Sequence, residues 1–130
     1  MTTMSNITVK DINNVDVTYV ALQRAAGDGS FAVWSDTLNE VPIFRPTFKL
    51  SSKSNGPGTA RRVSIDYRVP QLLQQPDNSF VVRDTLIFTV SGIVPTRVAE
   101  DELEKAVALF TNLLKNSQVT DSLTTGQTPI

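Results

Sequence analysis

Hydrophobic and polar residues alternate along most of the chain and then change to a helical spacing. From Ile7 to about Ser91, short segments rich in Val, Thr and aromatic residues lie between turn-forming residues, a pattern typical of β-strands. From about Thr96 to Asn116, apolar residues recur three and four positions apart, which predicts an amphipathic helix. An antiparallel β-sheet followed by a C-terminal helix is an α+β fold.

Turn-forming residues set the expected ends of the strands. The predicted strands are residues 7–12, 16–24, 30–35, 44–51, 62–69 and 80–91. Asn13-Asn14 and Asn55-Gly56-Pro57-Gly58 are expected to turn the chain, since these residue types favour turns. Pro70 is expected to end one strand, while Gly92 and Pro95 end the last one. Residues 36–40 and 72–79 are then predicted loops.

The strict alternation in residues 44–69 and 80–91 predicts a sheet with one apolar and one polar face, because neighbouring side chains of a strand point to opposite sides. The apolar face is expected to carry Phe44, Phe48, Leu50, Val63, Ile65, Tyr67, Val69, Leu86, Phe88 and Val90. The polar face is expected to carry Arg45, Thr47, Lys49, Ser51, Arg62, Ser64, Asp66, Arg68, Thr85, Ile87, Thr89 and Ser91.

The predicted helix has the charge order that a helix dipole favours. Thr96 is a candidate N-cap, acidic residues follow in the first turns, and Lys115 lies in the last turn. One apolar stripe contains Leu103, Ala106, Val107, Phe110, Leu113 and Leu114. After this main helix, a short tail helix is expected around Leu123.

This sheet is too wide for one helix to cover, which predicts a homodimer. About five strands spaced roughly 4.8 Å apart span about 24 Å, whereas a helix is about 10 Å across. A second copy would supply another helix, so Leu103, Val107, Phe110 and Leu114 are the expected dimer interface. Pairing of residues 80–91 with their twin would also remove an exposed sheet edge. All 130 residues are then one domain, with a sheet over about 7–91 and a helical dimerisation segment over about 96–125.

Composition argues against an enzyme. The chain contains no His and no Cys, which removes the commonest general base, the commonest metal ligand and any disulfide. Glu100, Asp101, Glu102 and Glu104 are better explained as a solvated helix start, and Asp66 as a cross-strand balance for its basic neighbours. We therefore expect no cofactor, no metal and no small-molecule substrate. Without a signal peptide or an apolar run long enough to span a bilayer, a soluble cytoplasmic protein is expected.

Charge is unevenly distributed although the formal net charge is only −1. Residues 43–83 contain seven basic and two acidic residues, while the start of the predicted helix is acidic. Either the polar sheet face binds nucleic-acid phosphates, or it is an ordinary solvated face. Trp34 and Tyr67 could likewise stack on RNA bases, although packing in the core is the commoner role for both.

The organisation of the chain resembles the coat proteins of small single-stranded RNA phages, the levivirus group. The residues that match are Ala32-Val33-Trp34, the segment from Arg61 to Val69-Pro70, and Leu113-Leu114-Lys115-Asn116. The resemblance implies an interlocked homodimer and a virion shell of icosahedral symmetry, assembled in the bacterial cytoplasm around single-stranded genomic RNA. It also implies that the loop after Pro70 surrounds the symmetry axes.

The same resemblance implies that the polar sheet face binds RNA, including an operator hairpin whose binding represses replicase translation. The implied RNA-binding residues are Arg45, Thr47, Lys49, Arg62, Ser64, Asp66, Arg68, Thr85, Ile87 and Thr89. Asp66 stands where the family typically has lysine, and Ile87 where it has asparagine, so the familiar purine pocket is not expected here. The alternative hypothesis is a dimeric single-stranded nucleic-acid-binding regulatory protein that forms no shell.

Overall fold

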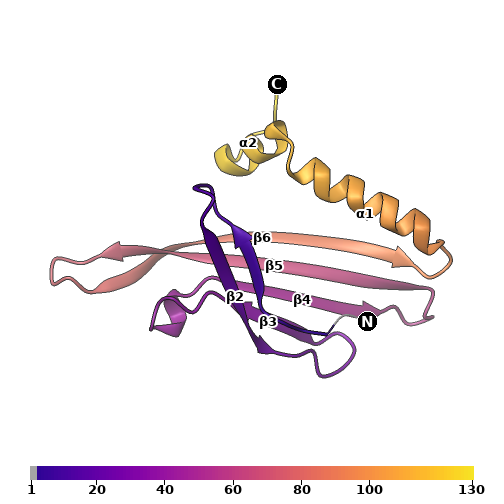
Figure 1. The fold of residues 1–130 in the computed structure, drawn as a ribbon, viewed down its shortest axis with the longest axis horizontal. Helices are drawn as coiled ribbons and strands as arrows, with labels where there is room; N and C mark the ends of the chain where they lie inside the picture. Colours follow the sequence, from indigo (N-terminus) through magenta and orange to yellow (C-terminus); the bar gives the residue numbers. More distant parts are fainter. Residues whose placement is uncertain (1–2) are drawn as a thin grey trace. The chain divides into compact units, whose positions relative to one another are not determined.

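The computed structural model describes residues 3–130 and contains an antiparallel sheet followed by two helices (Figure 1). Its six strands neighbour one another in chain order. They are β1 (Ile7–Lys10), β2 (Asp16–Gln23), β3 (Phe31–Ser35), β4 (Thr47–Ser54), β5 (Ala60–Gln74) and β6 (Phe80–Pro95). A 3-10 helix, η1 (Pro42–Phe44), precedes β4, and the helices are α1 (Glu100–Leu114) and α2 (Ser117–Thr125). The predicted α+β order of sheet, main helix and short tail helix is confirmed.

The chain forms two compact units, which are described separately: the strands as far as Thr96, and Arg97–Ile130. In the first unit, two predicted turns are confirmed. Asn14 adopts a positive φ of 62° between β1 and β2, and the Asp11 carboxylate accepts hydrogen bonds from the N–H groups of Asn13 and Val15. The turn from β4 to β5 is closed by hydrogen bonding between Asn55 and Ala60.

Two predicted ends of strands are wrong. β5 continues through Pro70 to Gln74, so the expected loop over residues 72–79 is reduced to a turn between Gln75 and Ser79. Beyond Arg68, β5 pairs with β6 and no longer with β4. A strand with one neighbour donates only every second N–H to the ladder, so Pro70, which has no N–H, is tolerated there. β6 likewise runs through Gly92 to Pro95.

The segment before β4 also differs from the prediction. Phe44 and Arg45 do not begin a strand, because Phe44 ends η1 and β4 starts only at Thr47, after Pro46. The nitrogen of Arg45 bonds to the carbonyl oxygen of Pro42 at 3.2 Å, which closes the 3-10 turn. The residue before a proline avoids the helical region, so Arg45 is extended and ends the turn.

In the second unit, α1 begins later than predicted. Thr96 is not its N-cap, because its N–H and Oγ1 both donate to the carbonyl oxygen of Thr59 and so close the end of the β5–β6 ladder. Ala99 is the N-cap residue and supplies no side-chain acceptor. The acidic first turn is confirmed. Lys115 is the C-cap residue of α1, and Asn116 caps α2 by accepting from the N–H of Gln118.

Candidate nucleic-acid interface and assembly surfaces

The register of the strands produces the two predicted sheet faces. Phe48 lies opposite Tyr67, which lies opposite Phe88, and these side chains belong to the apolar sheet face. One residue along, Lys49 lies opposite Asp66, which lies opposite Thr89, on the polar sheet face. A shift of one residue in either ladder would exchange the two sets of side chains, so the pairing itself fixes which chemistry each side of the sheet presents.

Nine of the ten predicted RNA-binding residues lie on the polar sheet face. Across the strands they form the rows Thr47, Arg68 and Ile87; Lys49, Asp66 and Thr89; Ser64, between Ser51 and Ser91; Arg62, between Lys53 and Ile93; and Thr85, opposite Pro70. The long β5–β6 ladder and the β4–β5 hairpin therefore bring together residues that are more than forty positions apart in the sequence.

Arg45 is the tenth, and the structure places it elsewhere. Its Nε donates to the carbonyl oxygen of Asn39 at 2.6 Å, and its Nη2 donates to that of Glu40 at 3.3 Å. The side chain thus closes the loop before η1 instead of extending the polar sheet face.

Most of the positive charge on the polar sheet face is not neutralised by the protein. Among residues 3–130, Lys49, Lys53 and Arg62 form no ion pair. Arg68 pairs with Asp66, Nε to Oδ2, at 3.2 Å. The other carboxylate oxygen of Asp66, Oδ1, is buried and accepts no hydrogen bond within this described part of the chain.

Arg61 contributes to the basic count of the sequence but not to this face. It lies opposite Ser54, on the apolar side, and donates to Asp28 and to Ser52. The N–H of Ser54 also donates to the Asp28 carboxylate, and this hydrogen bond, with that of Arg61, lowers the pKa of Asp28. The pair ties the β2–β3 connection to the end of the β4–β5 hairpin.

The aromatic residues are divided between the faces in a way that the sequence did not suggest. Trp34 is the one buried hydrophobic side chain among residues 3–130; it packs against Phe48 and donates from Nε1 to the carbonyl oxygen of Ser5. Tyr67 is also on the apolar side. Phe31, by contrast, lies on the polar sheet face and is 39% exposed. Its even spacing from Val33 is a local signal in the sequence, but the pairing with Ser51 that decides the face of Phe31 is seen only in the structure.

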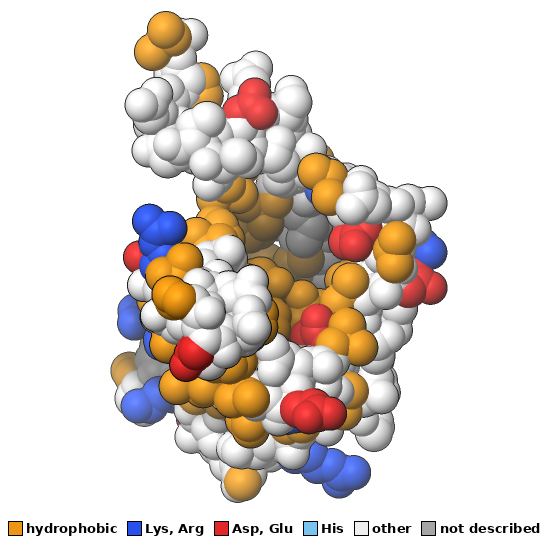
Figure 2. Space-filling view, turned by 90° about the vertical axis from the view of Figure 1, so that its left-hand side faces the viewer, with side chains coloured by type: hydrophobic (Ala, Val, Ile, Leu, Met, Phe, Trp, Pro, Cys, Tyr) orange, Lys and Arg blue, Asp and Glu red, His pale blue; other side chains and the backbone are white. Residues whose placement is uncertain are grey.

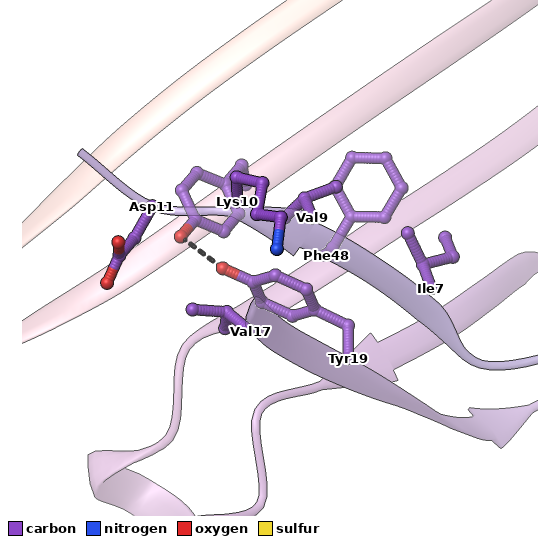
Figure 3. Close-up of a pocket in the computed structure, with 8 residues that line it drawn as sticks. Ile7, Val9, Lys10, Asp11, Val17, Tyr19 and Phe48 are labelled. Carbon is purple, nitrogen blue, oxygen red and sulfur yellow. Dashed lines mark hydrogen bonds between the residues drawn. The ribbon is translucent and has the colours of Figure 1, made fainter. Parts of the chain in front are cut away.

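The β1–β2 hairpin and the apolar sheet face line an open pocket of about 470 Å³ (Figure 3). Ile7, Val9 and Val17 line it from the hairpin, and Phe48 lines it from β4. At its edge the hydroxyl groups of Tyr19 and Tyr67 are hydrogen-bonded at 2.7 Å. Burial, followed by this hydrogen bond, raises the pKa of the Tyr19 phenol well above its ordinary value.

Large apolar side chains remain exposed in both units. On the apolar sheet face these include Leu86 and Phe88, and the stripe of α1 exposes Val107, Phe110 and Leu114, with Leu103 half-buried. Figure 2 shows hydrophobic side chains gathered over the middle of one view, with Lys and Arg side chains at its margins. Neither described helix has the length and apolarity needed to cross a bilayer.

Comparison with known proteins decides the family. The family model described as Levivirus coat protein matches residues 2–130. The chain belongs to the levivirus coat protein family. As a coat protein it is a structural subunit of a virion capsid and not an enzyme. No curated protein matches the chain.

Solved coat-protein structures share the fold at low sequence identity. The virus-like particle of bacteriophage NT-214 aligns with a TM-score of 0.85 at 18% identity, covering 99% of this chain and 100% of that one. For the particle of Beihai levi-like virus 21 the TM-score is 0.83 at 15% identity, with 99% and 98% covered. For the capsid protein of bacteriophage GA it is 0.75 at 17% identity, with 97% and 96% covered.

Proposed function

We propose that this coat protein forms a homodimer, that the dimers assemble into an icosahedral shell in the bacterial cytoplasm, and that the polar sheet face lines the interior and binds single-stranded genomic RNA. The proposed RNA contact is supported by four basic residues that lie together on one face: Lys49, Lys53, Arg62 and Arg68. Asp66 is the single acid among them. Each unneutralised cation adds salt-dependent affinity for phosphate.

The dimer is supported by surfaces that a single chain leaves open. β6 is 16 residues long, and among the strands of residues 3–130 it has a sheet partner, β5, on one side only. Such an edge is a template for further pairing, and antiparallel pairing of β6 with its twin obeys twofold symmetry. The exposed side chains of the apolar sheet face and of α1 also need cover. Leu103, Val107, Phe110 and Leu114 are the proposed contacts of α1.

Repression of replicase translation through an operator hairpin is a finer part of this proposal. The hydroxyl groups of Thr47, Ser64, Thr85 and Thr89 support it, because they lie on the same face as the cations and can donate to bases or phosphates. Asp66 and Ile87 alter the site, so we propose a hairpin contact that differs from the familiar purine pocket.

The amount of RNA in assembled particles tests the proposed RNA contact. In the double variant Lys53→Ala/Arg62→Ala we expect particles with less RNA, and, for the unassembled protein, a salt dependence of RNA binding reduced by about two phosphate contacts. The matched control is Lys10→Ala/Lys105→Ala, which removes the same charge away from the polar sheet face. RNA content would be measured by ultraviolet absorbance of purified particles. Equal RNA content in wild type, variant and control would contradict the proposal.

A further inference from the structure

We propose that Phe31 is a stacking platform for one unpaired base of the RNA, and that Lys49 covers its ring until the base arrives. The inference rests on the proposed RNA contact and adds a base-recognising residue to it. Phe31 is the first residue of β3, is 39% exposed, and lies opposite Ser51 on the polar sheet face. An aromatic ring held on such a surface offers a flat apolar face that every nucleobase can stack on.

Small side chains leave room beside the ring. Phe31 lies opposite Ser51, and this row continues across the sheet through Ser64 and Ser91. Three successive serines make the surface next to the ring low and rich in hydroxyl groups. A base lying on Phe31 therefore meets no bulky side chain in that row, and its polar edge faces groups that both donate and accept hydrogen bonds.

Lys49 already occupies the ring face in the free protein. Its Nζ lies 6.0 Å from the centroid of the Phe31 ring, within the range of a cation–π contact. Lys49 is also directly opposite Asp66, yet the two form no ion pair, and Oδ1 of Asp66 has no hydrogen-bond partner among the described residues. When a base displaces the ammonium group, the neighbouring carboxylate or the phosphate of the same nucleotide can receive it.

The charges around Phe31 favour a nucleotide over an apolar protein segment as the occupant. Lys49 lies over the ring, and the stem of Lys53 lies close to Gly29, just before β3. An apolar peptide laid on Phe31 would bury these ammonium groups without a partner, which is costly. A nucleotide supplies a flat base for the ring and a phosphate for the ammonium groups.

Two RNA probes separate stacking from phosphate attraction. Purified full-length protein would be titrated with a fluorescein-labelled 12-nucleotide single-stranded RNA, and with an abasic oligomer of the same length and charge. We expect wild type to prefer the base-bearing oligomer by about tenfold, since stacking of one base is worth that order of affinity. Phe31→Leu should abolish this preference at unchanged salt dependence, and Phe31→Tyr should retain it. Lys49→Ala should retain the preference while the salt dependence falls by about one phosphate contact.

The possible failures are distinguishable. A wild-type protein that binds neither oligomer contradicts the proposed RNA contact itself. A preference for bases that persists in Phe31→Leu overturns the stacking platform and leaves the RNA contact standing. If Phe31→Leu keeps the preference but no longer assembles into particles, Phe31 contacts protein instead, and the platform is again overturned. Circular dichroism would establish that the Leu and Tyr variants are folded.

Discussion

The two faces of β4, β5 and β6 come from the same strands but differ in what they expose: one exposes apolar side chains and the other exposes positive charge. The apolar sheet face keeps Leu86 and Phe88 exposed and requires a surface that removes them from water. On the polar sheet face, Lys49, Lys53 and Arg62 form no ion pair with any residue of the described range 3–130, and we propose that this face binds RNA. Because side chains alternate along a strand, one sheet presents an apolar surface, which we propose binds protein, and a basic surface, which we propose binds RNA, about one backbone thickness apart.

The largest effect is expected from a charge on the apolar side of β6. Phe88→Asp should prevent dimerisation and therefore particle formation, because the dimer would bury a carboxylate without a partner. The matched control is Ile87→Asp, on the adjacent residue, which is 52% exposed and faces the polar side. It should still dimerise. Light scattering and electron microscopy would measure this. Equal assembly of both variants would contradict the assignment of the faces.

A second contrast lies within β3, where Trp34 and Phe31 point to opposite sides. Trp34→Ala should lower the free energy of unfolding by about 3–5 kcal/mol, because it removes a buried indole. Phe31→Ala should change it by less than about 1 kcal/mol, as is usual for an exposed position. Denaturant unfolding at one fixed protein concentration would compare them. If Phe31→Ala lowered the free energy of unfolding as much as Trp34→Ala does, Phe31 would belong to a core.

The hydrogen-bonded hydroxyl pair beside the pocket gives a smaller effect. Tyr19→Phe should cost about 1 kcal/mol, the usual net value of such a bond. The pKa of Tyr19 is raised in the folded state, so its contribution to stability is complete below the ordinary tyrosine pKa of 10.0 and is lost as the pH rises further. Wild type should therefore lose stability above pH 10 more steeply than Tyr19→Phe. If wild type and Tyr19→Phe lost stability equally steeply as the pH rose above 10, this prediction would be contradicted.

The smallest effect is expected at the exposed Asp28–Arg61 pair. The pKa of Asp28 is lowered in the folded state, so its contribution is present above the ordinary value of 3.8 and is lost as the pH falls below it. Asp28→Asn should therefore be slightly less stable than wild type at neutral pH, and the difference should shrink toward pH 2. Thermal unfolding across this range measures it. A difference that grows on acidification would be inconsistent with the lowered pKa.

Local patterns predicted the elements better than their ends. The alternation around Phe48 and Lys49 was sufficient for both faces, since strand periodicity is local. The extension of β5 past Pro70 depends on which neighbouring strand is present at that point, and this is information that the sequence does not carry locally. Thr96 looked like an N-cap because its long-range bonds to Thr59 could not be seen.

The candidate site shows the same limit. Nine of the RNA-binding candidates that the resemblance implies lie on the polar sheet face that strand periodicity predicts. Arg45 was misplaced because the 3-10 helix before β4 has no strong pattern of its own. Phe31 was missed because its face depends on the register between β3 and β4. Trp34 and Tyr67, the aromatic residues that the sequence suggested as candidates for stacking on bases, face the apolar side.

Electron cryomicroscopy of particles assembled from the full chain tests the central claim most directly. The account predicts a closed icosahedral shell of dimers in which β6 pairs with its twin, the polar sheet face lines the interior, and RNA density lies against Lys49, Lys53 and Arg62. A shell whose polar sheet face points outward, or whose RNA density avoids that face, would contradict it.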